Sequence, residues 1–254
     1  MRKVVVLIVL MFVSGTVVAQ PSPQVKFDGA NDLLESGDYR NALKSYREIE
    51  SSETVSGALY LNMGIAAVQL DSLGLAKFYF LNAQKFDGTT ESASQALEFV
   101  NSQFSRQSAK LPKLPWDKAV DALKVNPGTF GLFLIGYVLL CITLLLIITL
   151  WFNLISIPKA KNVIATCITV SVIIIALAYY VDYVDQRYDE ALLIKAESTV
   201  FTAPGEDKEL VSMAYEGYDI IIDWKKSADQ ENWYYIRLGN GQYGWIKAEG
   251  IKIL

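Results

Sequence analysis

The sequence predicts a multidomain membrane protein that combines an all-α part, a two-helix transmembrane hairpin and a small all-β domain. Three observations carry this prediction: two long uncharged runs in the middle of the chain, an internal repeat before them, and short β-rich runs after them. The expected parts, in chain order, are a signal peptide at 1–19, helical repeats with a capping helix at 20–107, a linker and interfacial helix at 108–128, transmembrane helix 1 at 129–151, a cytoplasmic turn at 152–161, transmembrane helix 2 at 162–182, a juxtamembrane linker at 183–194 and the β domain at 195–254.

The N-terminus has the composition of a secretory signal peptide. Arg2 and Lys3 precede an apolar stretch over residues 4–13, and small residues then lead to Ala19. This order of a basic start, an apolar core and small residues predicts cleavage after Ala19. An uncleaved signal anchor is the alternative, and it leaves the expected topology unchanged.

An internal repeat predicts that the next region is helical. Residues 27–49 align with residues 61–83 at an offset of 34 residues, and the paired positions match in size and polarity, as at Tyr46 and Phe80. A repeat of this length is typical of stacked helix pairs. Residues 90–104 have apolar side chains at three- and four-residue spacing, which predicts a further helix that caps the stack.

The second copy of the repeat resembles the tetratricopeptide repeat family. The large, small and aromatic positions of that family are occupied by Tyr60, Met63, Gly64, Ala67, Ala76, Phe80 and Ala83. The resemblance implies that the first helix of each pair lines a groove for a segment of a partner protein. The inward residues would be Phe27, Asn31, Leu34, Leu61, Ile65 and Val68. The alternative is that these side chains only pack against neighbouring helices.

A spacer and a short amphipathic segment follow the repeats. Pro112 and Pro115 bias the residues before them away from helix, so we expect residues 110–115 to be extended. Trp116 begins a segment with one apolar face, which predicts a helix at the outer membrane surface with Trp116 as its anchor. An ordinary packed helix is the alternative.

Two uncharged runs predict the transmembrane hairpin. Residues 127–157 and residues 162–181 are both apolar, and each reaches the length of about 20 residues that spans a bilayer. The short connection carries Lys159 and Lys161, which places it in the cytoplasm by the positive-inside rule. The expected protein is therefore a two-pass protein of a bacterial inner membrane, with its N- and C-terminal domains in the periplasm.

The C-terminal part predicts a small all-β barrel. Runs rich in Val, Ile, Tyr and Trp alternate with turn residues, and the expected strands lie at 198–202, 210–213, 218–224, 233–238 and 243–247. The sequence Gly239-Asn240-Gly241 is the clearest hairpin turn, because such turns need positive φ. Short strands at this spacing favour a barrel.

The segments around the last two expected strands resemble the bacterial SH3-like (SH3b) domain. The resemblance is carried by residues 232–238 and residues 241–246. It implies recognition of peptidoglycan peptides or of protein segments, with Trp233, Tyr235 and Trp245 as the groove candidates. The alternative is that one or both tryptophans belong to the core.

Composition excludes several kinds of chemistry. The chain has no histidine, and its two cysteines, Cys141 and Cys167, lie in the apolar runs, so imidazole-based catalysis and His-containing zinc sites are excluded. Residues 20–126 carry 11 Lys and Arg against 13 Asp and Glu, and residues 182–254 carry 8 against 14. Neither part has the basic balance of a nucleic-acid binder. We expect no enzyme activity, no cofactor and no metal.

The order of the parts resembles the E protein family of the Bacteroides aerotolerance (Bat) operon. This resemblance implies a non-enzymatic, membrane-anchored scaffold in an oxidative-stress complex. Its partners would be a MoxR-type ATPase system and membrane proteins with von Willebrand factor A domains. The alternative function is binding or sensing of cell-wall peptidoglycan through the β domain.

Overall fold

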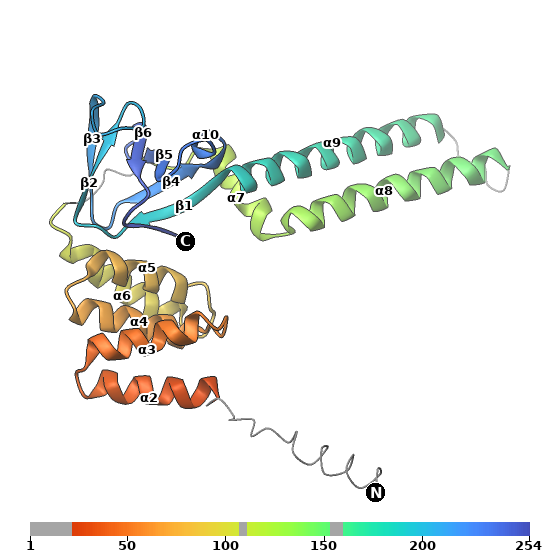
Figure 1. Cartoon of the computed structure of the whole chain (residues 1–254). Helices are drawn as coiled ribbons and strands as arrows, with labels where there is room; N and C mark the ends of the chain where they lie inside the picture. The colour runs from red at the N-terminus through yellow and green to blue at the C-terminus, as the bar shows by residue number, and fades with distance from the viewer. Residues whose placement is uncertain (1–21, 107–110, 153–159) are drawn as a thin grey trace, which may run out of the picture. The chain divides into compact units, whose positions relative to one another are not determined.

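The computed structural model describes residues 22–106, 111–152 and 160–254 (Figure 1). The predicted signal peptide and most of the predicted cytoplasmic turn lie outside these residues. The chain divides into two compact units, Met1–Val100 and Asn101–Leu254.

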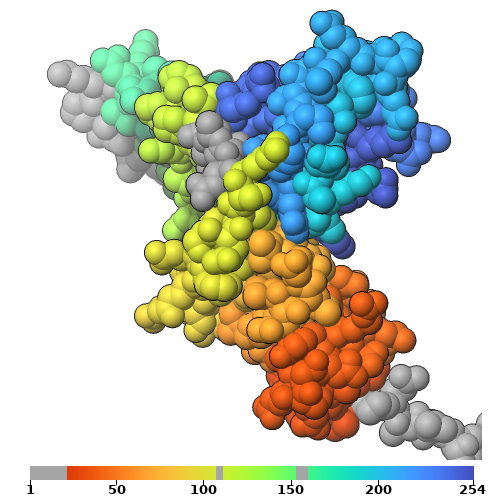
Figure 2. Space-filling model, turned by 90° about the vertical axis from the view of Figure 1, so that its left-hand side faces the viewer, coloured from red at the N-terminus to blue at the C-terminus, as the bar shows by residue number. Residues whose placement is uncertain are grey.

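The first unit is all-α, as predicted. Its helices are α2 (Pro23–Glu35), α3 (Tyr39–Glu50), α4 (Gly57–Gln69), α5 (Leu73–Ala83) and most of α6 (Thr90–Gln103). Ser22, Asp38 and Ser56 accept hydrogen bonds from first-turn amides of α2, α3 and α4. These caps satisfy donors that have no partner within the helix. Figure 2 shows the side chains of α2 to α5, coloured red to orange, as one closely packed body.

The internal repeat corresponds to two successive helix pairs, α2 with α3 and α4 with α5. The aromatic residues at matching positions, Tyr46 and Phe80, are both buried. Gly64 allows α4 and α5 to approach closely, because a Cβ atom there would lie 2.4 Å from the Phe80 ring. The predicted further helix is confirmed as α6, which buries Ala93, Leu97 and Val100.

Two long apolar helices belong to the second unit. They are α8 (Gly128–Trp151) and α9 (Ala160–Arg187), which lie side by side in Figure 1. Their contact is close at Gly136, whose carbonyl oxygen accepts a hydrogen bond of 2.6 Å from the buried Ser171 hydroxyl. Both helices are long and apolar enough to cross a membrane, and only 17% and 11% of their most apolar stretches are buried. This surface lacks the protein cover that a core helix of a soluble domain has.

Helix α7 (Pro115–Val125) packs against α8 and α9. Val120 and Leu123 contact a buried cluster that includes Leu132, whereas the side chain of Trp116 is exposed. The predicted single apolar face is therefore divided: one part packs on protein, and Trp116 remains at the surface.

The second unit ends in one antiparallel sheet with the strand order β3-β2-β6-β5-β4-β1-β7. Its strands are β1 (Tyr188–Leu193), β2 (Glu197–Phe201), β3 (Leu210–Tyr215), β4 (Asp219–Asp223), β5 (Trp233–Leu238), β6 (Tyr243–Lys247) and β7 (Ile251–Ile253). The core of this domain consists of Ala191, Leu193, Val200, Ala214, Ile220, Ile222, Ile236, Leu238 and Ile246.

The structure differs from the predicted linker at residues 183–194. Helix α9 continues to Arg187, and β1 follows at once (Figure 1). In the strand order, β1 lies between β4 and β7. The acidic residues of this segment suggested a solvated linker, yet Ala191 and the two leucines after it are fully buried. The short helix α10 (Trp224–Ser227) is a second difference, because the sequence predicted continuous strand through Trp224.

Candidate functional site

Strands β5 and β6 present two different faces because side chains alternate along a strand. Ile236, Leu238 and Ile246 point into the core. The residues between them point to the other face, and the register pairs Tyr235 with Trp245. The same face carries the cross-strand pairs Trp233 with Lys247 and Arg237 with Tyr243.

Five aromatic residues gather on this outer face, and we call them the aromatic strip: Phe201, Trp233, Tyr235, Tyr243 and Trp245. The Tyr235 ring centroid lies 5.4 Å from that of Trp245 and 6.2 Å from that of Tyr243. Phe201 and Trp233 are 5.8 Å apart. Four of the rings are half-buried, and Tyr243 is 53% exposed. The structure thus brings the three predicted groove residues together, and neither Trp233 nor Trp245 belongs to the core cluster.

Gly244 explains how Phe201 reaches this strip. A Cβ atom on Gly244 would lie 2.5 Å from Val200 Cγ1 and 2.7 Å from the Phe201 carbonyl oxygen. The absence of a side chain therefore lets the end of β2 cross close to β6, where Phe201 pairs with Trp245. A shift in register between Val200 and Phe201 accompanies this crossing, as expected where a bulge redirects a side chain.

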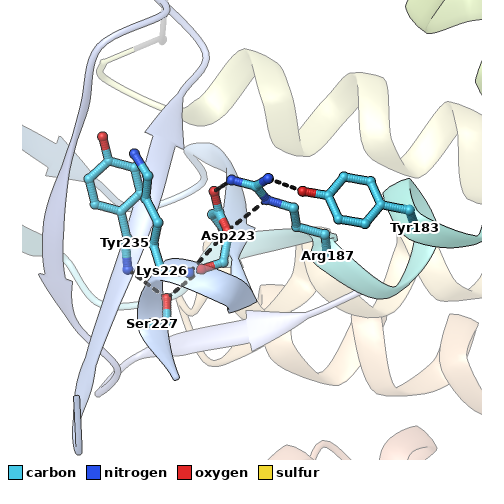
Figure 3. Close-up of polar contacts among 6 residues, drawn as sticks. All are labelled: Tyr183, Arg187, Asp223, Lys226, Ser227 and Tyr235. Atoms are coloured by element: carbon cyan, nitrogen blue, oxygen red, sulfur yellow. Dashed lines mark hydrogen bonds and ion pairs between the residues drawn. The ribbon is translucent and has the colours of Figure 1, made fainter. Parts of the chain in front are cut away.

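Helix α10 places a cation beside the strip (Figure 3). The Lys226 Nζ atom lies 4.0 Å from the centre of the Tyr235 ring, within cation–π distance. The turn is held by Ser227, whose hydroxyl donates to the Asp223 carbonyl oxygen at 2.8 Å and accepts from the Tyr235 amide at 2.9 Å.

Asp223 connects this turn to the end of α9. Its carboxylate accepts two hydrogen bonds from the Arg187 guanidinium, at 3.1 and 2.7 Å, and one from the Lys226 amide at 3.2 Å. Arg187 also donates to the Tyr183 hydroxyl (Figure 3). Burial alone raises the pKa of Asp223, but the hydrogen bonds from Arg187 and Lys226 outweigh it and hold the pKa below its ordinary value.

The six residues predicted for the repeat groove lie on two helices of the first unit. Phe27, Asn31 and Leu34 are on α2, and Leu61, Ile65 and Val68 are on α4. Five of them are half-buried, and Ile65 is 39% exposed. The helix pairing therefore leaves Ile65 exposed and the other five side chains of this mostly apolar set partly accessible.

Asn31 has a structural role in that set. Its side-chain oxygen accepts hydrogen bonds from the Tyr46 hydroxyl at 2.7 Å and from the Asn62 amide at 2.9 Å. Burial raises the pKa of Tyr46 to about 12, so the hydroxyl remains a donor at neutral pH. Asn31 thus joins α2 to α3 and α4.

Three residues at the aromatic strip were not predicted from the sequence: Phe201, Tyr243 and Lys226. Tyr243 could have been found, since it lies two residues before Trp245 and so shares its face. Phe201 and Lys226 come from other elements, and only the strand pairing and the α10 turn bring them to Tyr235.

Acidic and cysteine side chains do not form a metal-binding group among the residues that the structure describes. Within these residues, no three His, Cys, Asp or Glu side chains are grouped so that they could hold a metal ion. Cys141 and Cys167 are free thiols on α8 and α9.

The sheet and its aromatic strip define a small antiparallel β domain with an exposed, ring-lined face. A family model, the GW (Gly-Tryp) dipeptide domain, matches residues 185–252. GW domains are SH3b-like cell-wall-binding domains, and Gly244-Trp245 is a Gly-Trp dipeptide within the matched residues. The match begins before β1, in agreement with the sheet and not with a domain start at residue 195. No curated protein matches the chain.

Proposed function

We propose that this protein is a membrane-anchored, non-enzymatic cell-wall protein whose GW domain binds peptidoglycan through the aromatic strip. The observation that carries the proposal is that the five rings lie on the outer face of the domain that matches a cell-wall-binding family. Aromatic rings offer large, rigid apolar surfaces on which sugar faces and short peptides can pack.

The apolar helices give this domain a membrane anchor. Helices α8 and α9 are long enough to span a bilayer, and Lys161 lies at the end where they are connected. A cytoplasmic position of that end follows from the positive-inside rule. The first unit and the β domain would then lie in the periplasm, on the side of the inner membrane where peptidoglycan is found.

The test is sedimentation of the full-length tagged protein with purified peptidoglycan in mild detergent. We expect the wild type to sediment, and Trp245→Ala or Tyr235→Ala to weaken binding about tenfold, as at a central aromatic contact of an interface. The control is Trp116→Ala, which removes an exposed tryptophan of α7. Absence of wild-type sedimentation, or equal binding by Trp245→Ala, would contradict the proposal.

An adaptor is the second candidate, and the helix pairs of the first unit support it. The repeat forms α2 with α3 and α4 with α5, and the predicted groove residues keep an accessible apolar part at Ile65. In this function the first unit holds a partner protein. The resemblance to the Bat E family suggests a MoxR-type ATPase system and von Willebrand factor A-type membrane proteins in an aerotolerance complex. That suggestion depends on the order of the parts alone.

The adaptor is tested by purification from native membranes and mass spectrometry of the bound proteins. Ile65→Glu places a charge in the proposed groove, and Val25→Glu places one at an exposed position of α2 outside it. Loss of the same partners in Ile65→Glu and their retention in Val25→Glu would support the adaptor. Equal partner sets in both variants would contradict binding at the groove.

Point variants are better suited here than a deletion of residues 27–104. A Cβ atom on Gly217 would lie 2.4 Å from the Phe104 ring, so Phe104 packs against the β domain. A deletion through Phe104 would therefore disturb both candidate functions at once.

A further inference from the structure

The basic residues of the β domain differ in whether a carboxylate neutralises them. Lys195, Lys208 and Lys247 form ion pairs with Glu249, Asp207 and Glu206. Among the described residues, Lys225, Lys226 and Arg237 have no such ion pair, and the last two adjoin Tyr235. Lys226 lies over its ring, and Arg237 follows it two residues later on the same face of β5.

The position of Lys226 is fixed by its backbone. Its amide donates to Asp223, and Ser227 in the same turn is hydrogen-bonded to the Tyr235 amide (Figure 3). The Asp223 carboxylate pairs with Arg187 at 2.7 Å and forms no ion pair with the Lys226 ammonium. The result is a held cation beside an aromatic ring, with its charge available to a ligand.

An anion needs such a local cation here because the surrounding domain is acidic. Residues 182–254 carry 8 Lys and Arg against 14 Asp and Glu, so their summed charge disfavours an approaching anion. Charge-assisted hydrogen bonds from Lys226 and Arg237 would offset that repulsion at the strip alone. The two cations therefore favour a ligand that joins an apolar or sugar surface to an anionic group.

We propose that Lys226 and Arg237 bind a free carboxylate of the peptidoglycan peptides while the aromatic strip holds the adjoining part of the wall. This inference rests on the proposed function, and it adds the chemical group that is recognised. An acidic protein segment would carry the same carboxylate chemistry, and the test below separates it from the wall.

The experiment measures binding of the full-length protein in mild detergent to two preparations of peptidoglycan. One has free peptide carboxylates, and in the other they are converted to amides. We expect the wild type to bind the amidated wall about tenfold more weakly, since hydrogen bonds to charged groups contribute that much. Lys226→Gln and Arg237→Gln should lose a similar factor on the untreated wall and respond less to amidation.

Lys225→Gln is the matched control. Lys225 is the same residue type in the same turn, but its ammonium lies 5.9 Å from the ring of Tyr183 and faces α9 rather than the strip. We expect this variant to bind both preparations as the wild type does. Unchanged tryptophan fluorescence in each variant confirms that the domain is folded.

The outcomes separate the two proposals. If Trp245→Ala loses binding but Lys226→Gln does not, the aromatic site stands and the carboxylate site is overturned. If Lys225→Gln and Lys226→Gln lose binding equally, the net charge of the domain, and not a carboxylate site at Lys226, determines the binding. If the wild type binds neither wall preparation, both proposals fail.

Discussion

At the scale of single residues, Gly244 controls the arrangement of the aromatic strip. Gly244→Ala would place a Cβ atom against Val200 and against the Phe201 carbonyl oxygen, and a backbone atom cannot move away as a flexible side chain can. We expect a loss of about 2 kcal/mol in the free energy of unfolding. Chemical denaturation followed by tryptophan fluorescence measures it, because all five tryptophans lie after residue 115.

Gly29 supplies the matched control for this substitution. It lies within α2, and a Cβ atom there would have no neighbour within 4 Å. Gly29→Ala should therefore stabilise the helix by about 0.5–1 kcal/mol, measured by helical circular dichroism. Wild-type stability in Gly244→Ala would show that β2 and β6 do not need the glycine.

Asp223 should make the stability of the β domain depend on pH. Its side chain is 9% exposed and paired with Arg187, and its pKa is below the ordinary value. A carboxyl group with a lowered folded-state pKa stabilises at neutral pH, and this contribution is lost as the pH falls below about 3.9 towards the folded-state pKa. Asp223→Asn should cost about 2 kcal/mol at pH 7.

Unfolding curves of the wild type and Asp223→Asn at several pH values test this dependence. The difference between the two proteins should shrink as the pH falls through the acidic range, because the wild-type carboxylate becomes protonated. A difference that stays constant from pH 7 to pH 3 would rule out the Arg187 ion pair as its source.

The candidate site could be predicted in part from residue types. Trp233, Tyr235 and Trp245 were recognisable because the strand pattern around them resembles a known domain. Lys226 was not, since its position depends on α10, a short helix that the sequence did not predict after the expected strand at 218–224. A turn held by backbone hydrogen bonds to the side chains of Ser227 and Asp223 has no periodicity that the sequence would show.

At the scale of elements, β1 shows how local charge can hide a strand. Asp189 and Glu190 suggested a solvated linker, but each has a partner in the fold. Asp189 accepts a hydrogen bond from the Trp224 indole at 2.7 Å, and Glu190 pairs with Lys113 at 2.9 Å. These partners are distant in sequence, so only the tertiary structure reveals them. Helices α2 to α6, by contrast, follow from local apolar spacing and turn residues.

The position of β1 predicts which fragments of the domain fold. A fragment of residues 195–254 lacks β1 and so leaves a gap between β4 and β7. A fragment of residues 183–254 keeps β1 and the Arg187–Asp223 pair. We expect dispersed amide signals by NMR from the longer fragment and an unfolded spectrum from the shorter one. A folded shorter fragment would show that β1 is dispensable.

At the scale of the whole molecule, the junction of α9 with β1 limits where the GW domain can act. The helix ends at Arg187 and the strand begins at Tyr188, so no linker separates them. If α9 spans the membrane as proposed, the aromatic strip is held at a short, fixed reach from the bilayer. Wall binding would then join peptidoglycan to the membrane directly. A partner protein held by the first unit would be attached to the membrane through the same two helices.

This arrangement requires the first unit and the β domain to lie outside the cytoplasm, which cysteine labelling can test. In a variant with Cys141 and Cys167 replaced by alanine, single cysteines are introduced at three exposed positions: Asp87, Lys161 and Asn240. We expect a membrane-impermeant maleimide to label Asp87→Cys and Asn240→Cys on intact spheroplasts, and Lys161→Cys only after permeabilisation. The reverse pattern would place the aromatic strip in the cytoplasm, away from peptidoglycan, and would overturn the wall-binding function whatever the purified protein binds.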